Sequence, residues 1–313
     1  MKLVTFSNGS GEPHVGVLLA GETTIADLTA SGEAHFADMI ALMSGGDRAL
    51  DAARALADAP EETAELSAVT LLAPVPVPTQ MFDCLCFEEH LLNSANNAHI
   101  VSNKERVIRT DGGRMPEVYR ELPVYYKGNR FSVVGTGADI VKPGYTKFLD
   151  YELEFGVFLS RQGKDMTPDE AADAIFGYTI FNDVSARDMQ MSEMRGMLGP
   201  SKGKDFDTGN VMGPWLVTKD EVPIDKGLRM RGWINGDLVT DGNSGKMMHS
   251  FPEIVAYASQ SETRRPGEFF GSGTVGGGCG MEHGRFLQDG DVLELEVEGL
   301  GRLSNKVVFG SNG

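Results

Sequence analysis

Two glutamates stand two residues apart in an apolar, aromatic stretch, and this spacing limits how the chain can fold there. Glu152 and Glu154 belong to the run DYELEFGVFL at 150–159. Successive side chains of a strand point to opposite faces, so an extended chain would place both carboxylates on one face. Asp183 follows a second apolar stretch, at 177–181, and adds a third carboxylate. Like charges this close together need a cation, so the pattern predicts a site for one hard metal ion.

The net charge excludes two kinds of partner. Lys and Arg total 28 against 45 Asp and Glu, which gives a formal net charge of −17. Such a surface repels nucleic acid and anionic membranes, so we expect no binding to either. The sequence has no apolar run of membrane-spanning length and no signal-like start. We therefore expect a cytoplasmic protein.

The three cysteines predict neither a disulfide framework nor a zinc site. Cys84, Cys86 and Cys279 are too few and too oddly spaced for a set of disulfides. No second cysteine pair and no nearby histidine pair completes tetrahedral zinc spacing with the first two. Reduced, buried thiols are the expected state.

A proline-rich run separates two expected parts of the chain. The run LAPVPVP at 72–78 cannot sustain a helix or a central strand, so we expect a stiff, extended link. Residues 1–75 should form a small N-terminal α+β lobe and residues 76–313 the main domain. Strands are expected at 122–126, 152–159, 178–181, 215–218, 229–234 and 292–297. A helix is expected at 167–175, with Thr167 as its N-cap and Pro168 in its first position. The predicted fold is mainly β, of the α+β class.

Three motifs beyond the proline run resemble those of one known family. Asp83 precedes His90 by seven residues, the DYELE segment follows, and NDVSARDMQ stands at 182–190. In this order and spacing, over roughly residues 70 to 310, the chain resembles the fumarylacetoacetate hydrolase family. The resemblance implies a mixed β-sandwich or β-roll core and a homodimer.

The resemblance also implies a set of metal ligands. The four implied carboxylates are Asp83, Glu152, Glu154 and Asp183. Carboxylate oxygens are hard donors, which favour Mg²⁺, with Ca²⁺ or Mn²⁺ as alternatives, over zinc or copper. Some shorter relatives use three acidic ligands, so a purely structural role for Asp83 stays open.

By the same resemblance, His90 is a general base that activates a water molecule. An imidazole needs a partner that fixes its tautomer and stabilises its charged form. Glu294 matches the family's partner glutamate. Glu294, Glu296 and Glu298 alternate along one expected strand, however, so all three could equally be solvated side chains.

Three further residues are implied to stabilise an oxyanion. Arg187 and Gln190 are three residues apart and would share one face of a helix. Lys204 joins them through the family's register, and Lys202 is the competing choice. Cationic and donor groups of this kind hold the negative charge of a tetrahedral intermediate.

Substrate contacts are implied for Tyr126, Lys127 and Thr274. Leu85 and Met194 stand where the enzyme that names the family carries tyrosines. Without those hydroxyl groups the pocket should not bind fumarylacetoacetate in the same way. The polar stretch 91–121 is expected to be either a mobile cover over the site or a loop without function.

Together these features predict a metal-dependent hydrolase that acts on a small anionic keto acid. The expected reaction is cleavage of a C–C bond in an acylpyruvate or related β-diketo acid. The alternative is a lyase on the same scaffold, which decarboxylates oxaloacetate or dehydrates a 2-keto-3-deoxy sugar acid, because one fold can host several reactions. A non-catalytic protein that keeps the scaffold is the third possibility.

Overall fold

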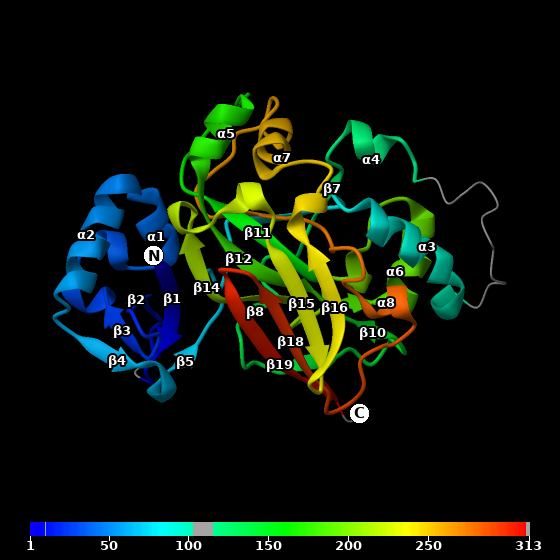
Figure 1. Cartoon of the computed structure of the whole chain (residues 1–313), viewed down its shortest axis with the longest axis horizontal. Helices are drawn as coiled ribbons and strands as arrows, with labels where there is room; N and C mark the ends of the chain where they lie inside the picture. The colour runs from blue at the N-terminus through cyan, green and yellow to red at the C-terminus, as the bar shows by residue number, and fades with distance from the viewer. Residues whose placement is uncertain (10, 103–114, 311–313) are drawn as a thin grey trace.

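Two β-sheets packed face to face form the centre of the computed structural model, which describes residues 1–9, 11–102 and 115–310 (Figure 1). The α-helices are α1 (Met39–Ser44), α2 (Gly46–Asp58), α3 (Glu88–Ser102), α4 (Val118–Glu121), α5 (Pro168–Ala174), α6 (Arg187–Glu193), α7 (Phe251–Ala258) and α8 (Gly280–His283). None of the described helices is long and apolar enough to cross a membrane.

The larger sheet is 12-stranded, and its main path runs β4-β3-β2-β1-β14-β12-β11-β17-β6-β7. Its strands, including the branches β5 and β8, are β1 (Lys2–Ser7), β2 (His14–Leu18), β3 (Thr24–Asp27), β4 (Thr63–Glu65), β5 (Thr70–Leu71), β6 (Gln80–Cys84), β7 (Tyr125–Lys127), β8 (Val133–Val134), β11 (Leu153–Leu159), β12 (Ile175–Asp183), β14 (Asn210–Thr218) and β17 (Glu268–Gly271). The two central strands β11 and β12 are buried along their whole length. They therefore bring their acidic side chains into the interior.

The second sheet has five strands in the order β16-β15-β18-β19-β9. They are β9 (Ile140–Lys142), β15 (Arg229–Ile234), β16 (Asp237–Asn243), β18 (Val292–Val297) and β19 (Gly301–Phe309). Alternate residues of β18, among them Leu293 and Leu295, join Phe155 and Val157 of β11 in one core. Burial of these apolar side chains between the sheets is the main force that holds the layers together. The mixed α+β fold confirms the predicted fold class.

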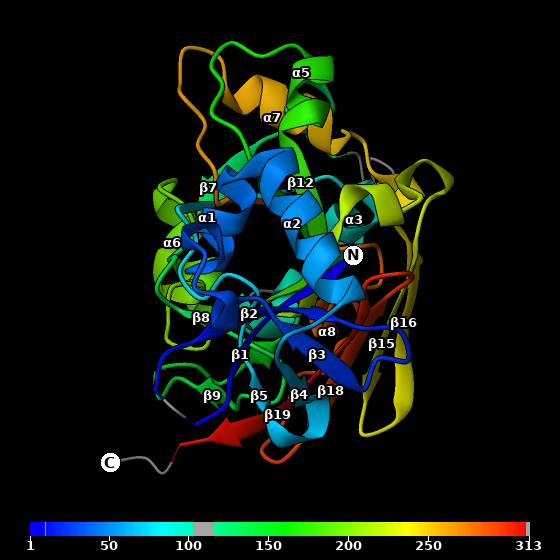
Figure 2. The ribbon, with the colours of Figure 1, turned by 90° about the vertical axis from the view of Figure 1, so that its left-hand side faces the viewer.

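The N-terminal strands extend the larger sheet. β1 pairs antiparallel with β14, with Leu3 opposite Leu216. Figure 2 shows α1 and α2 over this end of the sheet, and Phe36 and Leu42 share a core with Phe158 of β11. The N-terminal segment thus shares both a sheet and a core with the rest of the chain. The domain boundary at residue 75 stays a prediction.

Several predicted elements form where the sequence indicated. The helix expected at 167–175 is α5, and its N-cap Thr167 forms a capping box with Glu170. β15 and β18 occupy the predicted ranges, whereas β7 begins only at Tyr125. The delay has a local cause, because Leu122 caps the end of α4 and the following Pro123 has no N–H for a strand ladder.

The expectation of a cover or loop at 91–121 is wrong for its first part. Residues 91–102 belong to α3, and residues 118–121 form α4. Residues 103–114 lie outside the described part of the chain. Leu91, Ala95 and Ala98 of α3 line the cavity described below, so this segment forms part of the wall of the site.

Candidate active site

A cavity of about 230 Å³ lies between the larger sheet and helices α3 and α6, on the side of the molecule opposite α1 and α2 (Figure 1). One part of its wall is apolar and comes from α3, α6 and nearby loops. The other part is charged, and every charged group in it is buried. The charged residues are Asp83, His90, Glu152, Glu154, Asp183, Arg187 and Lys204.

Three carboxylates converge in this cavity from three adjacent or nearby strands. Asp83 of β6, Glu154 of β11 and Asp183 of β12 each offer an oxygen, and these oxygens lie within 4.8 Å of one another. The Oδ1 atoms of Asp83 and Asp183 have no hydrogen-bond partner among the described residues. Buried acceptors without partners are costly, and a divalent cation would satisfy them. The all-oxygen donor set therefore fits Mg²⁺ or Mn²⁺.

The carboxylate cluster depends on Gly271 of β17, which lies between Asp83 and Glu154. A Cβ atom at Gly271 would lie 2.4 Å from Asp83 Oδ1 and 3.2 Å from Glu154 Oε2. Gly271→Ala should displace both carboxylates and lower cation affinity by about 10-fold or more, measured by calorimetric titration with Mn²⁺. Gly128→Ala is the matched control, because its added Cβ would meet its nearest atom at 3.7 Å. Equal affinities of the two variants would contradict this role of Gly271.

Without a cation, the cluster must hold protons. Burial and the charge of Asp183 raise the pKa of Asp83 to about 8, from an ordinary value of 3.8. Between these pH values the folded protein keeps a proton that the unfolded chain releases, so the stability of the metal-free protein falls as pH rises. A bound cation replaces that proton. We expect Mn²⁺ to raise the Tm more at about pH 8 than at about pH 6. In Asp83→Asn, the Tm increase caused by Mn²⁺ should be the same at both pH values. A pH-independent shift of the unmodified protein in scanning calorimetry would contradict this expectation.

Glu152 occupies a different part of the cavity from the other carboxylates. Arg187 Nη2 donates to its Oε1 at 2.8 Å, and Lys204 Nζ donates to its Oε2. Burial alone would raise the pKa of Glu152, but Arg187 and Lys204 outweigh it and hold the pKa well below the usual range. Lys204 also donates to Asp183 Oδ2 at 2.5 Å. Glu152 is therefore neutralised by two cations, and its predicted role as a metal ligand stays a prediction.

His90 is held by Glu282, and the prediction of Glu294 for this role is wrong. His90 Nδ1 lies 2.8 Å from Glu282 Oε1, while its Nε2 lies 3.6 Å from Glu152 Oε1. Glu294 does not line the cavity and instead pairs with Arg302 at 3.3 Å. The reason is the alternation along β18, where the neighbours Leu293 and Leu295 face the core and Glu294 faces away.

The hydrogen bonds of Glu282 fix the tautomer of His90. Asn93 Nδ2 and the Gly277 N–H donate to Glu282 Oε2, at 3.0 and 2.7 Å. Burial raises the pKa of Glu282, but its hydrogen bonds with His90, the Gly277 N–H and Asn93 lower it to a net value below the usual one. The ionised carboxylate only accepts, so His90 Nδ1 carries the proton and Nε2 is left free as a base.

Asp150 is a second buried acid that supports the site residues and that sequence reasoning missed. Strand β10 (Leu149–Asp150) pairs with β13 (Ser185–Ala186), which places Asp150 beside Arg187. Arg187 Nε donates to Asp150 Oδ2 at 2.7 Å, and the N–H groups of Gly280 and Met281 also donate to this carboxylate. Asp150 thus fixes both the arginine and helix α8, which carries Glu282.

The sequence contains a local clue to Asp150 but none to Glu282. Asp150 opens the same apolar motif that holds the two glutamates, so its position was a usable clue. Glu282 has no local clue, because its contact with His90 joins residues 192 positions apart.

The predicted oxyanion residues lie together in the cavity. Arg187 Nη1 donates to Gln190 Oε1 at 3.0 Å, across one turn of α6. Lys204 is buried in the site, whereas the competing Lys202 is exposed and lies over the ring of Tyr145. The roles of Arg187, Gln190 and Lys204 in catalysis stay predictions.

Of the three predicted substrate contacts, one lines the cavity and two do not. Tyr126 lines the cavity and donates its hydroxyl to Asp183. Lys127 does not line it, since the next residue of a strand points to the opposite face, where its Nζ lies 5.6 Å from the Phe82 ring centre. Thr274 is buried and donates to Glu154 Oε1 at 3.2 Å, so it supports the carboxylate cluster from outside the cavity. The structure thus corrects the placement of Lys127 and Thr274.

Apolar residues form the rest of the cavity wall. Leu85 and Met194, the two departures from the family pattern, both line the cavity. Neither side chain offers a hydrogen bond to a polar substrate group. The contacts that could orient a substrate are therefore concentrated on the charged side.

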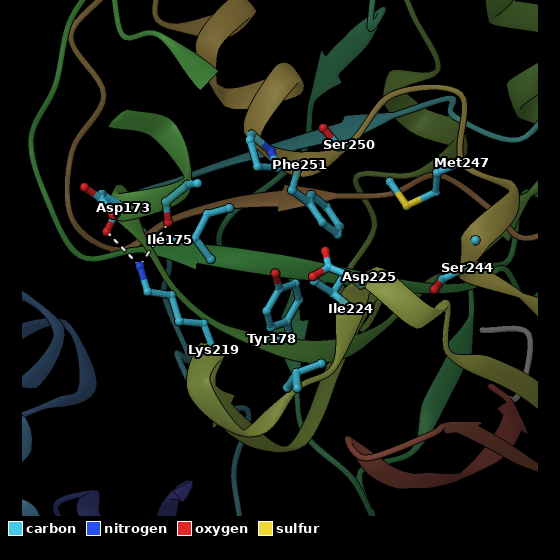
Figure 3. A pocket seen from close by; sticks show the side chains of 14 residues that line it. Asp173, Ile175, Tyr178, Lys219, Ile224, Asp225, Ser244, Met247, Ser250 and Phe251 are labelled. Atoms are coloured by element: carbon cyan, nitrogen blue, oxygen red, sulfur yellow. Dashed lines mark hydrogen bonds between the residues drawn. The ribbon is translucent and has the colours of Figure 1, made fainter. Parts of the chain in front are cut away.

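A larger cavity of about 700 Å³ lies elsewhere, between α5, α7 and the start of β12 (Figure 3). Phe251 and Tyr178 pack there with an interplanar angle of 65°. Its lysine, Lys219, already donates to the carbonyls of Ala172 and Asp173. Size alone therefore does not identify the reaction site, because the convergent carboxylates and the histidine are in the smaller cavity.

The fold and the smaller cavity define an enzyme with a buried acidic site on a two-sheet α+β scaffold. The family model for the fumarylacetoacetate (FAA) hydrolase C-terminal domain matches residues 86–308. The chain belongs to the fumarylacetoacetate hydrolase family.

Several relatives of this chain are named for the same activity. The Xenopus laevis protein named oxaloacetate tautomerase fahd2, mitochondrial, is 31% identical over 98% of this chain and 90% of its own length. The human protein named oxaloacetate tautomerase FAHD2A, mitochondrial, is 30% identical over 95% of this chain and 88% of its own. The Bacillus subtilis oxaloacetate tautomerase YisK is 32% identical over 77% of this chain and 74% of its own.

Solved structures of the family share the fold. A fumarylacetoacetate hydrolase from Exiguobacterium antarcticum has a TM-score of 0.75 and 26% identity, with 99% of both chains covered. A maleylpyruvate hydrolase from Sphingobium, in complex with manganese and pyruvate, has a TM-score of 0.74 over 99% of this chain and 100% of its own. At 22% identity, the second likeness concerns the fold alone.

Proposed function

We propose that this chain interconverts the enol and keto forms of oxaloacetate, with a divalent cation held by Asp83, Glu154 and Asp183. The observation that carries the proposal is that His90, which is paired with Glu282, lines the same small cavity as three convergent carboxylates. The relatives named oxaloacetate tautomerases support the choice of substrate.

The chemistry of the reaction matches the residues present. Tautomerisation moves a proton between carbon and oxygen and breaks no C–C bond. A bound Mg²⁺ or Mn²⁺ would supply Lewis-acid stabilisation of negative charge on the substrate oxygens. In the keto-to-enol direction His90 would take the carbon-bound proton at Nε2 and deliver it to the enolate oxygen. In the reverse direction it would carry the proton from oxygen to carbon, while Glu282 stabilises the charged imidazolium. Arg187 and Lys204 already pair with buried carboxylates, so they would offset the local negative charge that would otherwise repel an anionic substrate.

The size of the cavity favours a substrate with few carbon atoms. Its volume is about 230 Å³, below the roughly 300 to 1,000 Å³ of pockets for drug-sized ligands. The apolar wall around Leu85 and Met194 offers no hydrogen bond, so both carboxylates of a four-carbon diacid would have to lie on the charged side of the cavity.

The predicted hydrolysis of an acylpyruvate remains the second candidate. The same histidine and glutamate could activate a water molecule for attack on a ketone. Decarboxylation of oxaloacetate needs the metal site but no such base. Of the three reactions, it is therefore the one that the presence of His90 supports least.

Parallel assays separate these candidates. The purified protein with Mg²⁺ or Mn²⁺ is mixed with oxaloacetate freshly dissolved as the enol, and the loss of enol absorbance is followed. Pyruvate release from oxaloacetate and cleavage of acetylpyruvate are measured on the same preparation. We expect tautomerisation to be fastest, and His90→Ala to return it to the uncatalysed rate. Faster cleavage of acetylpyruvate would overturn the proposal in favour of the hydrolase.

The predicted partners and assembly complete the proposal. We propose a homodimer that takes up its small keto-acid substrate from solution and binds neither nucleic acid nor membrane. Sedimentation velocity of the full chain measures its mass in solution. A cytoplasmic location stays a prediction.

A further inference from the structure

Cys279 lies against the His90–Glu282 pair, on the side away from the carboxylate cluster. Its Sγ is 3.8 Å from His90 Nδ1 and 3.6 Å from Glu282 Oε1. Ser94 Oγ is 3.9 Å from the same sulfur and 3.4 Å from His90 Nδ1. A thiol, an imidazole, a carboxylate and a hydroxyl group thus meet around one point.

We propose that this point is a second, inhibitory metal site, which binds Zn²⁺ through Cys279 Sγ, His90 Nδ1 and Glu282 Oε1, with Ser94 Oγ as the fourth donor. Sulfur, nitrogen and oxygen donors of this kind are the usual ligands of zinc. The carboxylate cluster offers only oxygen and selects hard cations. The two sites therefore differ in the metal they prefer, although His90 and Ser94 also line the cavity of the carboxylate cluster.

The distances between the donor atoms suit a tetrahedral ion. With bond lengths of about 2.0 to 2.3 Å, the ligand atoms of tetrahedral zinc lie roughly 3.3 to 3.6 Å apart. The two distances from Cys279 Sγ, 3.8 and 3.6 Å, are close to this range. The 2.8 Å between His90 and Glu282 reflects the proton that they share, and it would lengthen when the metal replaces that proton.

Charge and access also favour the site. Two protons change place when Zn²⁺ binds: the thiol proton of Cys279 passes to solvent, and the Nδ1 proton of His90 moves to Nε2. The resulting thiolate and the Glu282 carboxylate neutralise the charge of the ion, which a buried site requires. His90 and Ser94 both line the cavity, so two of the four donor residues border the space through which an ion would enter.

Glu152 is the other carboxylate within reach of His90 and Cys279. It is a poorer ligand than Glu282, because Arg187 and Lys204 already neutralise its charge. Glu282, by contrast, has only the histidine as its charged partner among the described residues.

Zinc binding would inhibit the enzyme because it changes the tautomer of His90. With zinc on Nδ1, His90 carries its proton on Nε2 and cannot accept another from a substrate. Zinc should therefore stop the proton transfer without displacing the cation of the carboxylate cluster. This inhibition rests on the function proposed above, whereas the binding of zinc does not.

The test uses the full chain with enough Mg²⁺ to saturate the carboxylate cluster. Co²⁺ is then added in place of Zn²⁺, because Co²⁺ can be detected by its absorption spectrum. Binding of Co²⁺ at Cys279 should produce a thiolate-to-cobalt charge-transfer band, and Zn²⁺ should abolish the band by competition. Cys279→Ala should lose the band, weaken zinc binding by more than about 100-fold, and escape zinc inhibition while keeping the activity measured without zinc. Cys86→Ala, which alters another buried free cysteine, is the control and should behave like the unmodified protein.

Two outcomes would overturn the proposal. One is the absence of a charge-transfer band in the unmodified protein, which needs no variant to fold. The other is equal zinc inhibition of the Cys279→Ala and unmodified proteins, which would mean that zinc acts at the carboxylate cluster. A band in a protein without tautomerase activity would support the zinc site and refute only the proposed function.

Discussion

Replacement of Glu282 by glutamine is expected to lower kcat for the tautomerisation by about 100-fold or more. An amide cannot stabilise the imidazolium form of His90, and it can hold the ring in the wrong tautomer. Glu294→Gln is the matched control, since Glu294 pairs with Arg302 and does not line the cavity. Its kcat should stay within about twofold of the unmodified value, because a surface ion pair contributes little.

The pH dependence of kcat distinguishes loss of function from loss of structure. Glu282→Gln should shift or flatten the limb of the pH profile that reports His90, while its circular dichroism spectrum stays unchanged. A large loss in Glu294→Gln together with normal activity in Glu282→Gln would restore the assignment made from the family pattern.

Removal of one carboxylate from the cluster should have the second large effect. Asp183→Asn deletes a negative charge at the point where β12 meets Lys204 and Tyr126. Loss of the cation removes several kcal/mol of charge stabilisation, so turnover should fall by more than about 1,000-fold. The metal content after dialysis should fall in parallel, and added Mn²⁺ should restore part of the activity only at high concentration.

The control for this experiment is Glu268→Gln. Glu268 is also a buried acid on the larger sheet, but it lies beside Arg264 and outside the cavity. It should keep its metal and its turnover even if its stability falls. Normal turnover of Asp183→Asn after removal of metal by a chelator would exclude a metal-dependent reaction at this cluster.

Local patterns sufficed for those parts of the molecule whose partners are close in sequence. The capped helix α5 followed from Thr167, Pro168 and Glu170, because a capping box needs only residues within one turn. The extended segment with Glu152, just before β11, and Glu154, within β11, followed from alternation, and both side chains line the cavity. The signature at 182–190 likewise placed Asp183, Arg187 and Gln190 together, since a strand end and the next helix keep them close.

Predictions failed for residues whose side chains point to one or the other face of a strand according to the exact strand register. Lys127 and Glu294 carry suitable charges, but each occupies the strand position that points away from the cavity. A shift of one residue reverses the face of every side chain in a strand, so charge and approximate position cannot decide the matter.

The sequence by itself determined the chemistry of the site: the hard oxygen donors, the histidine and the buried cations are all present in short motifs. Only the tertiary structure decided which acid serves the histidine. Glu282 reaches His90 because Asp150 holds the start of α8, and because α8 lies against α3. Such a contact joins distant segments through the packing of separate elements, and no local pattern in the sequence records it.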